Sequence, residues 1–229
     1  MTKARYHHGD LRNALLRAAA SLAETGPEAV TIRAAAKLVG VTPTAAYRHF
    51  ANHEELLQAV KQDAFHTLGQ AMTARLAQVP PDRDPVLAAL ARLDALGRGY
   101  IGFAMVEPGL FRTAFFRGGS GPPMPDVLEH LDSPFTMLSV ALDDLVAVGY
   151  LAEESRPMAE LAAWAAVHGV ATLMTEGPMA EMPDEDREQF VDRTMAAVGV
   201  GFSDGPRADA ARTDPAVRTG RLTARAVRT

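Results

Sequence analysis

Apolar residues recur at helical spacing along nearly the whole chain, and no segment shows the sustained alternation of a surface strand. One such stripe runs from Leu11 to Leu22 and ends at Gly26-Pro27, a pair that typically stops a helix. Alanine and leucine dominate these segments. The pattern therefore predicts an all-α protein, and sheet-based folds are excluded.

Capping residues mark two short helices in succession. Thr31 can cap a helix that passes through Ile32 and ends at Gly40. Thr42 can cap the next helix, with Pro43 at the first position, where a missing N–H costs nothing. Because so short a turn separates the two helices, the sequence predicts a helix-turn-helix.

The remaining chain predicts a larger helical domain. A fourth helix is expected after Asn52, with Glu55 at the capping-box position, ending near residue 78. Further helices are expected over 84–104, 108–116, 133–150, 157–176 and 184–200, and a Gly/Pro-rich loop over 116–126. Falling apolar content from Ser203 onward predicts a disordered tail. The expected organisation is a helix-turn-helix domain over 1–52, a helical domain over 53–202 and a tail over 203–229.

Composition excludes several classes of protein. The 229 residues are 48% hydrophobic, which suffices for a substantial core, and they include no cysteine. Disulfide frameworks, thiol nucleophiles and cysteine zinc sites are therefore excluded. No apolar run reaches the roughly 18 residues of a membrane span, and no leader sequence opens the chain. We expect a soluble, cytoplasmic protein that does not contact a membrane.

The net charge of the chain is −5, but the charged residues are unevenly distributed along it. Residues 1–55 carry seven basic and five acidic side chains (+2), and 203–229 carry six and three (+3). The middle, 56–202, carries ten and twenty (−10). A basic N-terminal segment beside an acidic body indicates a region that meets a polyanion. A difference of +2 alone would also fit an ordinary fluctuation of charge.

The second helix of a helix-turn-helix lies in the major groove of DNA, and the residue types over 42–49 suit that role. Short hydroxyl side chains stand at its N-terminus, where the helix dipole favours phosphate. Ala45 is small enough to contact a thymine methyl, while Tyr47 and His49 can reach phosphate oxygens. The DNA-binding candidates are Thr31, Arg33, Thr42, Pro43, Thr44, Ala45, Tyr47 and His49. The alternative is a helical hairpin in which Tyr47 and His49 only cover apolar surface.

Residues 9–60 resemble the DNA-binding domain of the TetR family of bacterial transcriptional regulators. The matching features are an Ala/Leu-rich first helix, T-x-R-x-x-A over 31–36, Gly40-Val41, Y-R-H-F over 47–50 and an Asn-x-Glu-Glu-Leu-Leu opening of the fourth helix. The family usually has a lysine where this chain has His53. A histidine can still contact phosphate through an N–H, so His53 joins the DNA-binding candidates.

The N-terminal arm holds Lys3, Arg5, His7 and His8. It can touch phosphates or the minor groove, with Arg5 as its candidate, or it is a solvated terminus. No spacing of ligands indicates a metal site.

The resemblance also implies a homodimer whose C-terminal helices enclose a pocket, where a small-molecule effector changes DNA affinity. The W-x-x-x-H-G pattern at Trp164 resembles the C-terminal subtype named for that signature. The interface candidates lie on apolar faces of the last two helices: Leu161, Trp164, His168, Phe190 and Val198. His168 is interpreted as an interface residue, with ligand contact as the alternative.

Aromatic and Met residues cluster over 100–116, either as plain core or as part of a pocket. The ligand-binding candidates are Phe65, Tyr100, Phe103, Phe111 and Phe135. They favour a hydrophobic or aromatic ligand carrying few charges.

The sequence therefore predicts a repressor that leaves a pseudo-palindromic, double-stranded DNA operator when its effector binds. The main alternative is a helical protein-binding or scaffold protein that does not bind DNA. An enzyme is the third choice, because no acid–base or nucleophile constellation stands at a suitable spacing, and no cofactor is expected.

Overall fold

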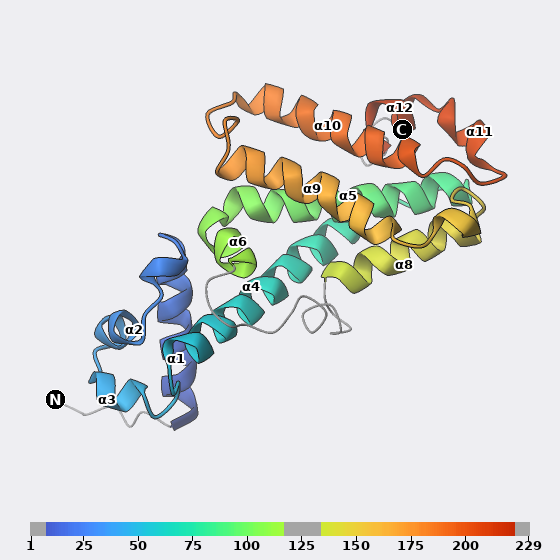
Figure 1. The fold of residues 1–229 in the computed structure, drawn as a ribbon. Helices are drawn as coiled ribbons and strands as arrows, with labels where there is room; N and C mark the ends of the chain where they lie inside the picture. The colour runs from blue at the N-terminus through green and yellow to red at the C-terminus, as the bar shows by residue number, and fades with distance from the viewer. Residues whose placement is uncertain (1–7, 117–133, 223–229) are drawn as a thin grey trace. The chain divides into compact units, whose positions relative to one another are not determined.

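The computed structural model describes residues 8–116 and 134–222. All regular secondary structure in these two ranges is helical (Figure 1), which confirms the predicted fold class. The first elements are α1 (His8–Ala23), the 3-10 helix η1 (Pro27–Ala29), α2 (Ile32–Val39), α3 (Pro43–Ala46) and α4 (His53–Leu76). They are followed by α5 (Pro85–Val106), α6 (Pro108–Phe115), α8 (Pro134–Ala147), η2 (Glu153–Ser155), α9 (Ala159–Thr175), α10 (Asp184–Gly201), α11 (Ala208–Arg212) and α12 (Pro215–Thr219). The predicted loop over 116–126 lies almost wholly outside the described residues.

The predicted caps are present. The Thr31 hydroxyl accepts a hydrogen bond from the N–H of Ala34 at 3.1 Å, and Thr42 accepts one from Ala45 at 3.3 Å. Gly40 ends α2 in the left-handed conformation, with φ of 77°. These local bonds explain why the helix boundaries around the turn could be predicted.

The chain divides into two compact units, and the division falls within α4. Unit 1 comprises residues 1–67 and 107–125, and unit 2 comprises 68–106 and 126–229. This division differs from the predicted boundary at residue 52, because α6 and the first part of α4 group with the N-terminal helices.

Unit 1 has its own hydrophobic core, formed where α1 packs against α2 and α2 against α3. Phe50 is buried there, and the Arg12 guanidinium lies 4.8 Å from the centre of its ring. Leu38, in contrast, is 60% exposed. It lies in the last turn of α2, just before Gly40.

Helix α6 is fixed to both α1 and α4 within unit 1. A Cβ at Gly109 would lie 2.4 Å from the carbonyl oxygen of Ala23, so only glycine permits this approach. Arg112 donates from Nη2 to the carbonyl oxygen of Thr25 at 3.0 Å. At the other end of α6, Lys61 donates to the carbonyl oxygen of Phe116 at 2.6 Å. We call these three contacts the α6 attachment.

Helix α5 is the centre of unit 2 and packs against α8, α9 and α10 (Figure 1). Most of its side chains are buried, from Val86 to Ala104. A Cβ at Gly99 would lie 2.7 Å from the Cα of Met72, so the end of α4 approaches α5 very closely. The core of unit 2 therefore depends on a small residue at this crossing.

The prediction of a disordered tail from Ser203 onward is wrong for residues 203–222. They form α11 and α12, and Val217 is 1% exposed. Sequence composition favoured disorder because the contacts that order this segment are with residues far away in the chain. The last seven residues, 223–229, lie outside the described part.

Candidate nucleic-acid interface and effector site

The helix-turn-helix leaves most of the predicted DNA-binding side chains accessible. Arg33, Thr42, Pro43, Thr44, Tyr47 and His53 are exposed, while Thr31, Ala45 and His49 are half-buried. Arg5 lies outside the described residues. The capped N-terminus of α3 therefore has short polar side chains around it, as contact with DNA requires.

Helix α3 is a single turn of four residues, and the residues that follow it continue the turn rather than the helix. Tyr47 is the C-cap and remains 46% exposed, although large aromatic side chains usually lose most of their exposure in a folded domain. Because its ring covers little of the core, the interpretation of Tyr47 as a mere cover for apolar surface is disfavoured.

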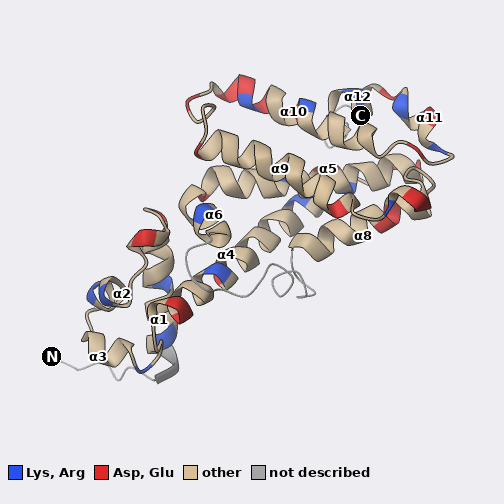
Figure 2. Cartoon of the chain, in the orientation of Figure 1, with Lys and Arg blue, Asp and Glu red and all other residues tan. Residues whose placement is uncertain are grey.

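Two exposed cations of the same motif were missing from the predicted set. Lys37 lies on α2 and Arg48 lies between Tyr47 and His49, and both are exposed. Figure 2 shows the basic segments of α1 and α2 in blue. The charge of Arg48 next to the predicted phosphate contacts could have identified it from the sequence.

In unit 2, three side chains from two helices form a hydrogen-bonded cluster. Trp164 and His168, one turn apart on α9, both contact Tyr100 on α5. The indole Nε1–H donates to the Tyr100 hydroxyl oxygen at 3.1 Å, and that oxygen lies 2.7 Å from Nδ1 of His168. We call these three residues the Tyr100 cluster.

The indole donor of the Tyr100 cluster has a fixed direction, and it is compatible with a chain of hydrogen bonds from Trp164 through Tyr100 to His168. An indole N–H can only donate, so the Tyr100 oxygen accepts from Trp164 and can donate its own hydrogen to Nδ1 of His168. In this arrangement His168 is neutral and carries its hydrogen on Nε2, a tautomer inferred from the network. Burial lowers the pKa of His168, although Glu176 opposes this shift, and burial raises the pKa of Tyr100, opposed by the bond from Trp164. Both shifts favour the neutral forms.

The predicted ligand-binding set is divided between the two units. Tyr100, Phe103 and Phe135 belong to unit 2, where the first two are buried and Phe135 is half-buried. Phe65 and Phe111 belong to unit 1, and both lie against Phe115 with ring centres 5.2 Å and 5.1 Å apart. Within unit 1, Phe115 therefore links two of the predicted ligand residues.

The predicted interface set is also divided. Trp164 and His168 point toward Tyr100 of the same chain, so the structure joins them to a predicted ligand residue. Val198 is only 9% exposed and is already covered by its own unit. Leu161 is 38% exposed and Phe190 is half-buried. Other exposed apolar side chains on α9 and α10 are Leu173 and Val200, which the sequence interpretation missed.

Between residues 8 and 116 and between 134 and 222, no group of three or more His, Asp or Glu side chains could hold a metal ion. None of the described helices has the length and apolar character to cross a membrane.

Comparison with known proteins agrees with this geometry. Residues 15–60 match the family described as bacterial regulatory proteins, tetR family, and residues 93–198 match the tetracyclin repressor-like C-terminal domain. Together these two matches cover most of the chain from the helix-turn-helix to α10. A search among curated proteins found no match.

Similar solved structures support the same fold. A protein of unknown function from Rhodococcus sp. RHA1 is 25% identical, with a TM-score of 0.71 over 88% of this chain and 100% of that one. RolR in complex with resorcinol is 20% identical, with a TM-score of 0.59 over 95% and 94% of the two chains. A candidate TetR-family transcription regulator from Shewanella sp. PV-4 is 17% identical, with a TM-score of 0.56 over 82% and 97%.

Proposed function

The chain belongs to the TetR family of bacterial transcriptional regulators, and on that premise we propose that it is a repressor released from its operator by a small hydrophobic ligand. It is a DNA-binding transcriptional regulator with a helix-turn-helix domain and a ligand-binding domain. Regulators of this family are typically not enzymes, and we propose no turnover for this one.

The DNA-binding part of the proposal depends mainly on the exposed, capped N-terminus of α3. In this proposal the exposed Thr44 and the half-buried Ala45 read base edges, while the exposed Tyr47 and Arg48 contact phosphates. Thr31 and Arg33 at the start of α2, and His53 at the start of α4, would add phosphate contacts. This division of labour predicts that different substitutions change affinity and base preference separately.

For the effector we propose a neutral or nearly neutral aromatic molecule that reaches the Tyr100 cluster. The cluster combines aromatic surface with hydroxyl, indole and imidazole groups, which suits a ligand that is mostly apolar and has few polar atoms. RolR, a structural relative, was solved with resorcinol, a small aromatic diol. Release requires the ligand to bind the DNA-incompetent arrangement more tightly, since equal affinity would shift nothing.

We further propose a homodimer formed through α9 and α10. Leu161 and Leu173 on α9, and Val200 on α10, leave between 37% and 39% of their surface exposed. Exposed apolar side chains such as these are covered when two copies associate. A two-fold dimer would present two α3 helices about 34–36 Å apart, one turn of DNA, and so read a pseudo-palindromic operator.

Selection of bound sequences from random duplex DNA tests the proposal most directly. The expected result is enrichment of one two-fold symmetric sequence, with the Tyr47→Phe variant enriching the same sequence more weakly. A titration against salt then separates this function from a protein-binding scaffold, because phosphate contacts make affinity fall as salt rises. No enrichment and no salt-dependent binding would favour the scaffold. A thermal-shift screen of aromatic compounds, with sugar phosphates as the comparison set, tests the ligand class.

A further inference from the structure

The C-terminal segment is attached to the rest of unit 2 at two places, and the first attachment is made by two backbone hydrogen bonds and one side chain. Gly205 donates its N–H to the carbonyl oxygen of Tyr150, and Arg207 donates to that of Gly149, both at 2.8 Å. Asp204 accepts a hydrogen bond from the N–H of Ala152 at 2.8 Å. This attachment fixes residues 204–207 beside the turn that follows α8.

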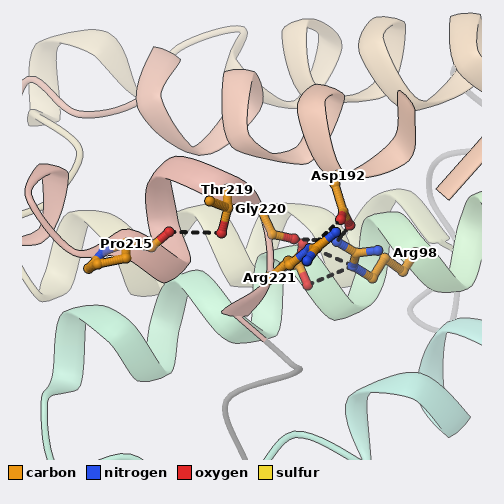
Figure 3. Close-up of polar contacts among 7 residues, drawn as sticks. Arg98, Asp192, Pro215, Thr219, Gly220 and Arg221 are labelled. Atoms are coloured by element: carbon orange, nitrogen blue, oxygen red, sulfur yellow. Dashed lines mark hydrogen bonds and ion pairs between the residues drawn. The ribbon is translucent and has the colours of Figure 1, made fainter. Parts of the chain in front are cut away.

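The second attachment is ionic and lies on α5 and α10. Arg98 of α5 donates from Nη2 to Asp192 of α10 at 2.7 Å and also to the carbonyl oxygen of Gly220. Arg221 donates from Nε to the other carboxylate oxygen of Asp192 at 2.7 Å. Figure 3 shows Arg98, Asp192, Gly220 and Arg221 meeting at this point, directly after α12.

The charges at this site balance only when the tail is docked. Asp94, which pairs with Arg98 at 3.0 Å, and Asp192 have side chains 3% and 8% exposed, and Arg98 is 14% exposed. These three residues alone carry a net charge of −1. Arg221, which is 60% exposed, supplies the second positive charge. Since a buried charge without a counter-charge is strongly unfavourable, the site on α5 and α10 favours an arginine at this position of the tail.

The site also fits the backbone of the tail closely. Gly220 has a φ of 68°, and a Cβ there would lie 2.0 Å from the carbonyl oxygen of Asp192, so a side chain cannot be accommodated. Val217, one turn earlier, is 1% exposed. The Asp214 carboxylate accepts a capping hydrogen bond from the N–H of Ala216 at 2.8 Å, so α12 begins at a defined residue. Shape and charge therefore both select this peptide.

We propose that residues 214–222 form a releasable strap, an intramolecular peptide ligand of the α5–α10 surface that Arg98 and Asp192 recognise. Docking of the strap holds α10 against α5, and so keeps α10 in the position that the proposed homodimer requires. The dimer part of this inference rests on the proposed function, whereas docking of the strap does not. Through the strap, unit 2 would thus modulate the association of two copies of the chain.

Limited trypsin digestion of the full-length protein tests docking. Mass spectrometry measures the rate at which the peptide bond after Arg212 is cleaved. This bond is present in every variant. Arg221→Gln is expected to raise the cleavage rate about tenfold, because cleavage follows the population of the open strap. Arg221→Lys, which keeps the charge, should give an intermediate rate. Arg218→Gln is the matched control: Arg218 is an exposed arginine of the same strap, and its loss should leave the rate unchanged.

A double-mutant cycle shows whether Asp192 is the partner. In an Asp192→Asn background, Arg221→Gln should add little to the cleavage rate, because the interaction is already lost. Equal cleavage in the wild type and Arg221→Gln, or equal acceleration by Arg218→Gln, would overturn the proposed docking.

Sedimentation of the same full-length variants tests the consequence for association. Arg221→Gln should raise the dissociation constant of the dimer about threefold or more, and Arg218→Gln should not. Faster cleavage with an unchanged dissociation constant would overturn the role of the strap in dimerisation. A monomeric wild type would instead show that the proposed homodimer is wrong, while the cleavage rates would still decide whether the strap docks.

Discussion

Arg112 and Thr25 are 87 residues apart in sequence, yet the guanidinium of Arg112 donates to the carbonyl oxygen of Thr25 at 3.0 Å. This bond joins α6 to the end of α1, next to the helix-turn-helix. Close by, Gly109 allows the backbone of α6 to touch that of Ala23 and Glu24. A change in α6 can therefore reach the DNA-binding helices directly within unit 1.

The first prediction compares two substitutions at the α6 attachment. Gly109→Ala should lower the free energy of unfolding by about 1–3 kcal/mol, because its methyl group would overlap backbone that cannot move aside. Arg112→Met should cost less, about 1 kcal/mol, because the bond to Thr25 is exposed and water can replace it. Urea denaturation measures both. A smaller loss for Gly109→Ala than for Arg112→Met would contradict this interpretation of the contact.

The second prediction concerns the division of roles on α3. Tyr47→Phe should weaken binding to every duplex by a similar factor, since phosphate contacts carry no sequence information. Thr44→Val and Ala45→Ser should instead change the preferred bases. Arg48→Gln should reduce the salt slope of binding by about one, and Arg83→Gln, an exposed arginine before α5, should not change it. Fluorescence titrations of all five variants with several duplexes give these results. Unchanged affinity in every α3 variant would exclude α3 as the groove-binding helix.

Sequence patterns predicted the parts of the fold that depend on neighbouring residues. Thr31 and Thr42 cap their helices through residues three positions away, and Gly40 ends α2 through its own backbone conformation. Such bonds are encoded within one turn of chain. The helix-turn-helix and its exposed candidates could therefore be identified from the sequence.

The contacts that could not be predicted join distant residues. Gly220 accepts from Arg98, 122 positions away, so the composition of the tail gave no sign that it is ordered. Trp164 and His168 lie on an apolar helical stripe, which indicated a dimer interface. Their partner Tyr100 is 64 and 68 residues away, and only the packing of α9 on α5 brings them together. Periodicity identifies the buried face of a helix but not the element that covers it.

The third prediction uses two glycines of α5 that differ only in their surroundings. Gly99→Ala should destabilise the protein by about 1–3 kcal/mol, because a Cβ there would meet the backbone of Met72 at 2.7 Å. Gly102→Ala is the control on the same helix, since no atom lies within 4 Å of the added Cβ. It should stabilise by about 0.5–1 kcal/mol through the higher helix propensity of alanine. Thermal unfolding of both variants measures the contrast. If Gly99→Ala and Gly102→Ala changed the stability in the same direction, α4 and α5 would not cross as closely as described.

The fourth prediction follows from the lowered pKa of His168. When the pKa of a histidine is lower in the folded state than in the unfolded state, the unfolded chain binds more protons as the pH falls below about 6.5. Protons then favour unfolding, so the contribution of His168 is fully present above pH 6.5 and is lost as the pH falls toward its folded pKa. Below that folded pKa the loss is complete and the dependence on pH becomes flat.

His168→Asn isolates this contribution, because the amide oxygen can still accept from Tyr100 but cannot bind a proton at these pH values. Denaturation of the wild type and the variant between pH 7.5 and 5 should show a steeper loss of stability for the wild type, most clearly below pH 6.5. Trp164→Phe removes the indole donor but leaves His168 able to titrate, so this control should keep a steep dependence on pH despite a lower overall stability. Other acidic groups and histidines titrate in all three proteins, and their effects cancel in the comparison. Parallel curves for the wild type and His168→Asn would mean that His168 does not bind its proton more weakly in the folded protein, and the inference that burial lowers its pKa would then be wrong.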